Sequence, residues 1–225
     1  TGASKGIGRA LAEKFASEGH NLAICARNEE NLKSLKKELE TKYSGIQVLI
    51  KSTDISKRKD VLAFAEAALK MFGSIDVLIN NGGIFLSGST CEENEGTLEK
   101  LIETNLYSAY HLTRAIVPFM TSSAKPHIFN MCSIASQTAY PNGGSYSISK
   151  FALLGFTKVL RQELLDKGIR VTAVLPGATW SDSWAGVDLP QERLMDAADI
   201  ADTIWAAYSL KKSAVVEEVI IRPQL

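Results

Sequence analysis

The sequence has few of the features that mark membrane proteins, disulfide-rich secreted proteins or nucleic-acid-binding proteins. No apolar run reaches the roughly 18 residues that a transmembrane helix needs. The three cysteines, Cys25, Cys91 and Cys132, are far apart and provide neither a disulfide framework nor a metal motif. Because 25 basic side chains balance 25 acidic ones, no net charge attracts nucleic acid or an anionic membrane. We therefore expect a small-molecule partner and a reducing, cytoplasmic location.

The composition of the chain is that of an ordinary globular domain. It has 225 residues, of which 45% are hydrophobic and 22% charged, and these values exclude a disordered or fibrous protein. The sequence contains no internal repeat, low-complexity tract or linker rich in proline or serine. We therefore predict a single domain over residues 1–225, although a length of about 150 residues per domain also allows two small ones.

Short apolar runs alternate with helix-length amphipathic stretches along the chain. The runs cover residues 22–25, 47–50, 75–79, 127–131, 169–175 and 215–221. Strands that are apolar on both faces are typical of a parallel sheet covered by helices on each side. The pattern predicts an α/β fold with a doubly wound parallel sheet of the Rossmann type. Because a glycine-rich turn that opens a helix should follow a strand, we also expect a strand ahead of Thr1.

The first eight residues, TGASKGIG, contain three glycines directly before an amphipathic helix. Glycines let the backbone approach a pyrophosphate closely, and a helix N-terminus offers free N–H groups and a partial positive charge. The spacing matches neither G-x-G-x-x-G nor the P-loop. A strand-to-helix turn without a ligand is therefore the alternative interpretation.

Tyr146 and Lys150 are four residues apart in SYSISKFALLGF, so they share one face of a predicted helix. Alone, such a pair is equally typical of a solvated helix surface. However, Ser133 ends the apolar run HIFNMCS, at the sheet edge where α/β proteins bind their ligands. Asn105 interrupts the helical stretch 98–120, and Pro176–Gly177 follows the next predicted strand.

The order of these motifs resembles the short-chain dehydrogenase/reductase family over essentially the whole chain. The matching segments are TGASKGIG, Asp54, NNGG at 80–83, Asn105, Ser133, YSISK and LPG. Two positions differ from the family pattern. The usual NNAG is NNGG, with Gly82 in place of alanine, which we expect the turn to tolerate. The usual Ser-Ser is Cys132–Ser133, so only Ser133 can supply the catalytic hydroxyl.

The resemblance implies a role for each catalytic position. Tyr146 is expected to be the general acid that protonates the substrate oxygen during hydride transfer, and the base in the reverse reaction. Ser133 is expected to bind the same oxygen, Lys150 to bind the nicotinamide ribose and tune Tyr146, and Asn105 to hold a water. The implied cofactor site, which includes no metal, also contains Gly2, Ser4, Lys5, Gly6, Ile7, Gly8, Arg27, Asn28, Asp54, Ile55, Asn81, Gly82, Pro176, Gly177 and Thr179.

The proton chemistry can be examined independently of the resemblance. A tyrosine pKa near 10 must fall by roughly 2–3 units for proton exchange at neutral pH. A cation about 4 Å away at an effective dielectric constant near 20 supplies about 4 kcal/mol. The sequence therefore predicts that Lys150 alone can lower the pKa of Tyr146 sufficiently.

The cofactor predicted from the residues is NADP(H). Sites that select NAD usually place Asp or Glu roughly 20 residues after the glycine turn, where the carboxylate repels a 2′-phosphate. At that point this chain has Ala26, followed by Arg27. Arg27 and Lys5 are two cations that could bind one phosphate, although both could also be ordinary surface charges.

The predicted substrate is a small carbonyl compound or alcohol. The expected substrate loop covers residues 178–195, where Trp180, Trp184 and Leu189 offer apolar contact or pack the loop onto the body. This loop and the ending AVVEEVIIRP are similar to those of bacterial sepiapterin reductases. The general motif pattern is also similar to that of 3-oxoacyl carrier-protein reductases. The absence of a basic cluster for a carrier protein favours a free substrate.

The alternative to an enzyme is a regulator that binds NADP as a sensor and has lost the catalytic activity. A sensor would not need the proton donor, so the complete set of four catalytic positions favours an enzyme. A serine hydrolase is excluded because no serine lies in G-x-S-x-G. We also expect a homodimer or homotetramer, because apolar residues spread almost all the way around the predicted helix 145–167 and must be covered. Neighbouring helices of the same chain are the alternative cover.

Overall fold

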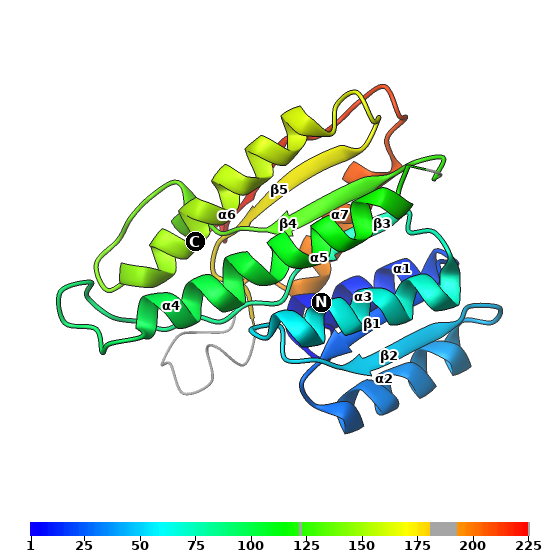
Figure 1. The fold of residues 1–225 in the computed structure, drawn as a ribbon, viewed down its shortest axis with the longest axis horizontal. Coiled ribbons are helices and arrows are strands. Elements are labelled where there is room, and N and C mark those ends of the chain that lie inside the picture. Colours follow the sequence, from blue (N-terminus) through cyan, green and yellow to red (C-terminus); the bar gives the residue numbers. More distant parts are fainter. Residues whose placement is uncertain (122, 181–192, 225) are drawn as a thin grey trace.

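The computed structural model describes residues 1–121, 123–180 and 193–224. In these ranges two parallel sheets lie side by side (Figure 1). One sheet pairs β1 (Leu22–Ala26) with β2 (Val48–Ser52). The other has the order β3 (Val77–Asn80), β4 (His127–Met131), β5 (Arg170–Pro176) and β6 (Glu218–Ile221).

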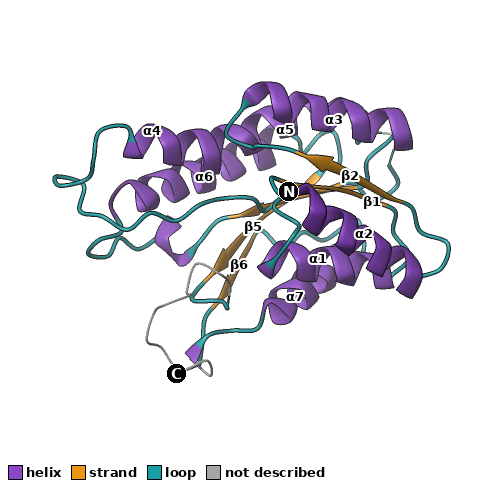
Figure 2. Ribbon diagram, turned by 90° about the horizontal axis from the view of Figure 1, so that it is seen from below, coloured by secondary structure: helices purple, strands orange, loops and turns teal. Residues whose placement is uncertain are grey.

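Helices cover both faces of the sheets (Figure 2). On one face lie α1 (Gly6–Ser17), α2 (Glu29–Lys42) and α7 (Ala197–Ser209). On the other lie α3 (Arg58–Phe72), α4 (Thr97–Ile102), α5 (Ser108–Ile116) and α6 (Gly144–Glu163). The prediction of a doubly wound α/β fold is confirmed.

The apolar runs form strands because both of their faces are covered. Every residue of β4 and β5 is buried, as expected for central strands of a parallel sheet. The helices that connect the strands each bury one stripe of apolar side chains. In α2 that stripe is Leu32, Leu35 and Leu39, all fully buried.

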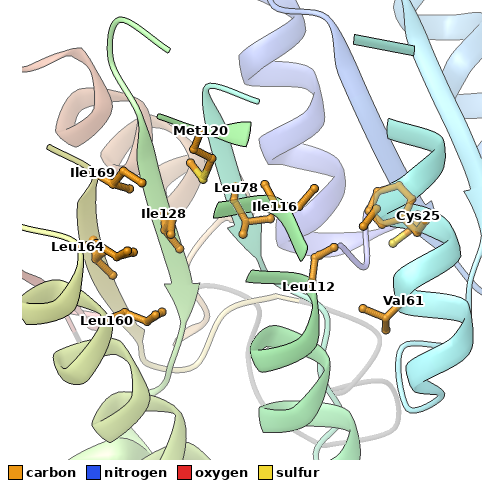
Figure 3. Close-up of a cluster of buried hydrophobic side chains, with 13 residues drawn as sticks. Cys25, Val61, Leu78, Leu112, Ile116, Met120, Ile128, Leu160, Leu164 and Ile169 are labelled. Atoms are coloured by element: carbon orange, nitrogen blue, oxygen red, sulfur yellow. The ribbon is translucent and has the colours of Figure 1, made fainter. Parts of the chain in front are cut away.

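The core joins the two sheets through the helices packed over them. One cluster contains Cys25 of β1, Leu78 of β3 and Ile128 of β4, together with side chains from α3, α5 and α6 (Figure 3). Cys25 and Cys132 are buried, whereas Cys91 is exposed in the segment before α4. The two sheets are therefore held in one packing unit.

The start of the chain lies between the two sheets. The Thr1 ammonium donates to the carbonyl of Ile79 at 3.0 Å, and the Ala3 amide donates to the carbonyl of Cys25 at 3.1 Å. Beside this connection is a cavity of about 410 Å³, lined by residues that include Leu11, Phe15 and Ile24. The strand expected ahead of Thr1 stays a prediction. No helix in the described ranges has the length and hydrophobicity to cross a bilayer.

Candidate active site

Three of the predicted catalytic side chains meet where β4 ends and α6 begins. Tyr146 and Lys150 lie in the first two turns of α6, and Ser133 follows β4 after one residue. The Ser133 side chain lies close enough to Tyr146 to lower the pKa of its hydroxyl. The Lys150 ammonium lies 5.8 Å from the centroid of the Tyr146 ring and donates to the carbonyl of Met131 at 2.8 Å. The structure therefore brings together a phenol, a hydroxyl and an ammonium group.

Burial dominates the protonation of this cluster. It raises the pKa of Tyr146, an effect that the nearby Ser133 side chain partly offsets. It also lowers the pKa of Lys150 to about 8. The prediction that Lys150 alone lowers the tyrosine pKa is therefore wrong, because burial removes the phenolate from water and this effect dominates.

Ser133 is fixed by the short turn that follows β4. Its Oγ accepts from the Ala135 amide at 3.1 Å, and its own amide donates to Ser136 Oγ at 3.1 Å. The neighbouring Cys132 is buried, with its Sγ 4.0 Å from Thr157 Oγ1. Burial raises the pKa of the Cys132 thiol to about 11, so this side chain stays a neutral core residue. Of the pair Cys132–Ser133, only Ser133 therefore carries a hydroxyl.

Asn105 lies in a π-helical turn, Glu103–Tyr107, between α4 and α5. Its Oδ1 accepts from the Ile84 amide at 2.8 Å, and its Nδ2 donates to the Ile84 carbonyl and to Ser149 Oγ, both at 3.0 Å. Ser149 Oγ in turn donates to the carbonyl of Tyr146 at 2.7 Å. The Asn105 side chain therefore connects the NNGG turn to α6, and the water expected there stays a prediction.

Two residues of this site, Phe85 and Ser149, were not predicted from the sequence. Phe85 packs edge-on against the Tyr146 ring, with 4.8 Å between the centroids and 86° between the planes, and it is 43% exposed. Its signal in the sequence is an aromatic residue shortly after NNGG. Ser149 accepts a hydrogen bond from Asn105. The only sequence feature that could have indicated it is its position next to Lys150. Phe85 gives Tyr146 a flat apolar neighbour that is itself partly exposed to solvent.

The glycine-rich turn and the NNGG turn form one unit. Thr1 Oγ1 accepts from the amides of Asn81 at 3.1 Å and Gly82 at 2.8 Å, while Asn81 Nδ2 donates to the Thr1 carbonyl at 2.8 Å. A Cβ on Gly8 would lie 2.2 Å from the Gly2 carbonyl oxygen, so this tight turn requires glycine. The first turn of α1 contains no acidic residue, and its N–H groups suit an anion.

Gly82 has a local explanation in the same unit. A Cβ at this position would lie 2.6 Å from Ile55 Cδ1, so the isoleucine side chain occupies the space of the usual alanine methyl group. The neighbouring Asp54 carboxylate accepts from Ser56 Oγ at 2.7 Å, which lowers the pKa of Asp54. Of these two predicted cofactor positions, Ile55 thus contacts the NNGG turn directly.

The positions expected to read the cofactor ribose lie after β1. Arg27 is exposed, and its backbone carbonyl accepts from Ser52 Oγ at 3.0 Å. Asn28 instead caps α2, because its Oδ1 accepts from the Asn31 amide at 2.9 Å. Lys5 is exposed at the start of α1, preceded in the turn by Ser4. No carboxylate stands at Ala26 to repel a phosphate.

The end of β5 reaches the same edge of the sheet. Beyond Pro176, the Gly177 amide donates to the carbonyl of Ile221 at 2.7 Å, and Thr179 Oγ1 donates to the carbonyl of Gly177 at 3.0 Å. Trp180 is 48% exposed. Most of the predicted substrate loop, including Trp184 and Leu189, lies outside the described residues.

Known proteins with this sequence pattern are oxidoreductases. A family model described as short chain dehydrogenase matches residues 1–191. The diacetyl reductase ((S)-acetoin forming) of Staphylococcus epidermidis is 34% identical over 92% of this chain and 80% of its own length. The sepiapterin reductase of Chlorobaculum tepidum is 32% identical over 99% of this chain and 94% of its own. A metagenomic short-chain oxidoreductase in complex with NADP superposes with a TM-score of 0.85 at 30% identity, covering 100% of this chain and 95% of that one.

Proposed function

Since the chain belongs to the short-chain dehydrogenase/reductase family, we propose that it is a carbonyl reductase in which Tyr146 donates the proton. It is an NADP-dependent oxidoreductase. The observation that carries the proposed mechanism is the position of Tyr146 beside Ser133 and the buried ammonium of Lys150, which lies 5.8 Å from the centroid of the Tyr146 ring.

The residues at the sheet edge fit an NADP(H) molecule. The glycine turn and the first turn of α1 offer backbone N–H groups without a nearby acidic side chain, which suits a pyrophosphate. The metagenomic short-chain oxidoreductase contains NADP. In this chain Arg27 would bind the 2′-phosphate, supported by Lys5, and Lys150 would bind the nicotinamide ribose. When bound, the cofactor supplies the hydride.

The three side chains at the end of β4 would divide the work of reducing a carbonyl group. Ser133 donates a hydrogen bond to the substrate oxygen, which orients the carbonyl carbon. As hydride reaches that carbon, the C=O π bond opens and the electron pair moves to oxygen. Tyr146 gives its hydroxyl proton to this oxygen, and the alcohol forms. Lys150 stabilises the phenolate that is left.

The raised pKa of Tyr146 supports the direction of reduction. A phenol whose pKa lies above its usual value is protonated at neutral pH, and a proton donor must start in that form. A buried cation next to it then lowers the cost of losing the proton in the transition state. The reverse reaction would need the phenolate at the outset and would be favoured at high pH.

The proposed mechanism is tested by Tyr146→Phe, which removes the proton and keeps the ring. General acid–base catalysis typically contributes about 10²–10⁴-fold. We expect kcat to fall by that factor while the NADPH dissociation constant, followed by fluorescence, stays within about twofold of the parent. A variant with parental turnover would exclude Tyr146 as the donor.

We propose a free small carbonyl compound as the substrate. The named relatives act on diacetyl or a pterin, and the Phe85 ring beside Tyr146 suits a flat or apolar group. A panel with diacetyl, sepiapterin and a 3-oxoacyl thioester, with NADPH oxidation as readout, separates this proposal from a carrier-protein reductase. A chain that binds NADPH and reduces no member of the panel would favour the sensor.

We also propose that the protein assembles as a homodimer or homotetramer through α6. The helix leaves one stripe uncovered, made of Ile148, Phe151, Gly155 and Val159. A Cβ on Gly155 would meet no atom within 4 Å, so the stripe is open to a second helix. Its spacing of three and four residues is that of a helix packing face.

A further inference from the structure

The helix that carries Tyr146 and Lys150 begins without a side-chain cap of its own. Its N-cap residue is Gly143, and Gly144 is its first residue. The free N–H groups of a first helical turn need partners, which a nearby Ser, Thr, Asp or Asn usually provides. Here the partner comes from 52 residues away.

The carboxylate of Glu93 caps the start of α6. One of its oxygens accepts from the Ser145 amide at 2.9 Å, and the other accepts from the Ser145 hydroxyl. A Cβ on Gly144 would lie 2.0 Å from Glu93 Oε1, so glycine at that position makes room for the carboxylate. Ser145, which donates both hydrogen bonds, directly precedes Tyr146.

The segment around Glu93 is tied to α6 by its backbone as well. The Gly88 amide donates to the carbonyl of Asn142 at 3.0 Å, and Ser87 Oγ donates to the same carbonyl at 3.2 Å. The segment before α4 and the start of α6 lie at the same end of the molecule (Figure 1). The same segment contains Phe85, whose ring packs on Tyr146. The segment that contains Glu93 thus contacts α6 both at its start and at Tyr146.

We infer that Glu93 is a positioning residue for Tyr146. Its negative charge at the positive end of α6 and its two hydrogen bonds to Ser145 fix the first turn of the helix. The direction of the Tyr146 hydroxyl toward Ser133 depends on that turn. In the described residues the Glu93 carboxylate contacts Ser145 at the start of α6, so we place its effect in that helix. This inference rests on the proposed role of Tyr146.

The test compares Glu93→Ala, Glu93→Gln and the control Glu92→Ala, an exposed glutamate one residue earlier. Misplacing a catalytic group by about 1 Å can cost about 10²-fold. We expect Glu93→Ala to lower kcat by about tenfold or more, with the NADPH dissociation constant unchanged within about twofold. The amide oxygen of Glu93→Gln still accepts from Ser145, so this variant should keep kcat within about threefold, and Glu92→Ala should match the parent.

Hydrogen exchange supplies a readout that does not depend on turnover. In Glu93→Ala the amide of Ser145 should exchange at least about tenfold faster than in the parent, while amides of β4 and β5 stay protected. Parental kcat in Glu93→Ala would overturn the inference, as would a parallel loss of kcat, NADPH affinity and melting temperature. If the parent itself reduces no carbonyl compound, the proposed function fails together with the positioning role, and Ser145 exchange alone then decides whether Glu93 caps α6.

Discussion

At the scale of single residues, the burial of Lys150 places a cation beside Tyr146 and lowers the stability of the folded chain. Its ammonium is buried, and its pKa falls from 10.5 to about 8. At about 1.4 kcal/mol per pH unit, that shift corresponds to a cost of about 3 kcal/mol in folding free energy at neutral pH. The hydrogen bond to the Met131 carbonyl does not remove this cost, because the pKa stays low with the bond present.

Lys150→Met should abolish turnover without lowering stability at pH 7. Below pH 8 the folded and unfolded chains both hold the lysine proton, so the cost is fully present. Between pH 8 and 10.5 the folded chain has released the proton and the unfolded chain has not, so parental stability rises with pH. From pH 7 to pH 9 we expect the unfolding free energy of the parent to gain about 1 kcal/mol relative to Lys150→Met.

Urea unfolding at the two pH values measures this difference. Lys100→Met, which removes an exposed lysine of α4, is the matched control and should follow the parent. If parent and Lys150→Met keep the same stability difference at pH 7 and pH 9, Lys150 does not titrate in this range.

At the scale of elements, we propose that the turn from β1 into α2 selects NADP(H) over NAD(H). Charge-assisted hydrogen bonds contribute roughly 1.5–3 kcal/mol each, so two cations on a 2′-phosphate predict at least about a hundredfold preference for NADPH. Ala26→Asp combined with Arg27→Ala should remove this preference or reverse it, because a carboxylate then faces the ribose. The measurement is kcat/KM with NADPH and with NADH.

Lys37→Ala, on the exposed side of α2, is the control for a general change of surface charge. It should retain the parental preference. Equal efficiency with both cofactors in the parent, or an unchanged ratio in the double variant, would show that this turn does not read the 2′-phosphate.

Elements with local patterns could be predicted from the sequence, and elements defined by distant contacts could not. The run 127–131 coincides with β4, because its apolar residues on both faces require burial. Of the run 215–221, only Glu218–Ile221 forms a strand, β6. This strand lies at the edge of the sheet and is less buried than β4. The interruption at Asn105 is visible in the sequence, but its side-chain bonds to Ile84 and Ser149 join distant segments and are not.

The residues of the candidate site also differ in whether local sequence patterns identify them. Tyr146, Lys150 and Ser133 could be found because helix spacing and strand ends are local signals. Glu93 lies among several acidic residues in CEENEGTLEK, and its partner is 52 residues away, so nothing local distinguishes it. The pKa of Tyr146 could not be predicted either, because burial is a property of the folded chain.

At the scale of the whole molecule, the uncovered stripe on α6 predicts self-association. Phe151 and Val159 are 44% and 53% exposed there. Light scattering at micromolar concentration should give two or four times the chain mass of 24.4 kDa. Phe151→Glu should lower that mass, because a buried unpaired carboxylate at an interface costs several kcal/mol.

Met71→Glu is the matched control, because Met71 is 43% exposed on α3 rather than on α6. It should leave the mass unchanged. A parent that scatters as a 24.4 kDa particle would exclude the proposed assembly, and an assembly that survives Phe151→Glu would place the interface elsewhere.

The positions of the three cysteines give the molecule a set of natural reporters for its own unfolding. Burial raises the pKa of Cys25 in the smaller sheet and of Cys132 beside the larger one, while Cys91 is exposed only two residues before Glu93. A thiol reagent reacts with the thiolate, so it should modify Cys91 first and reach the other two only when the structure opens. The order in which Cys25 and Cys132 react then reveals whether the two sheets separate one after the other or open together.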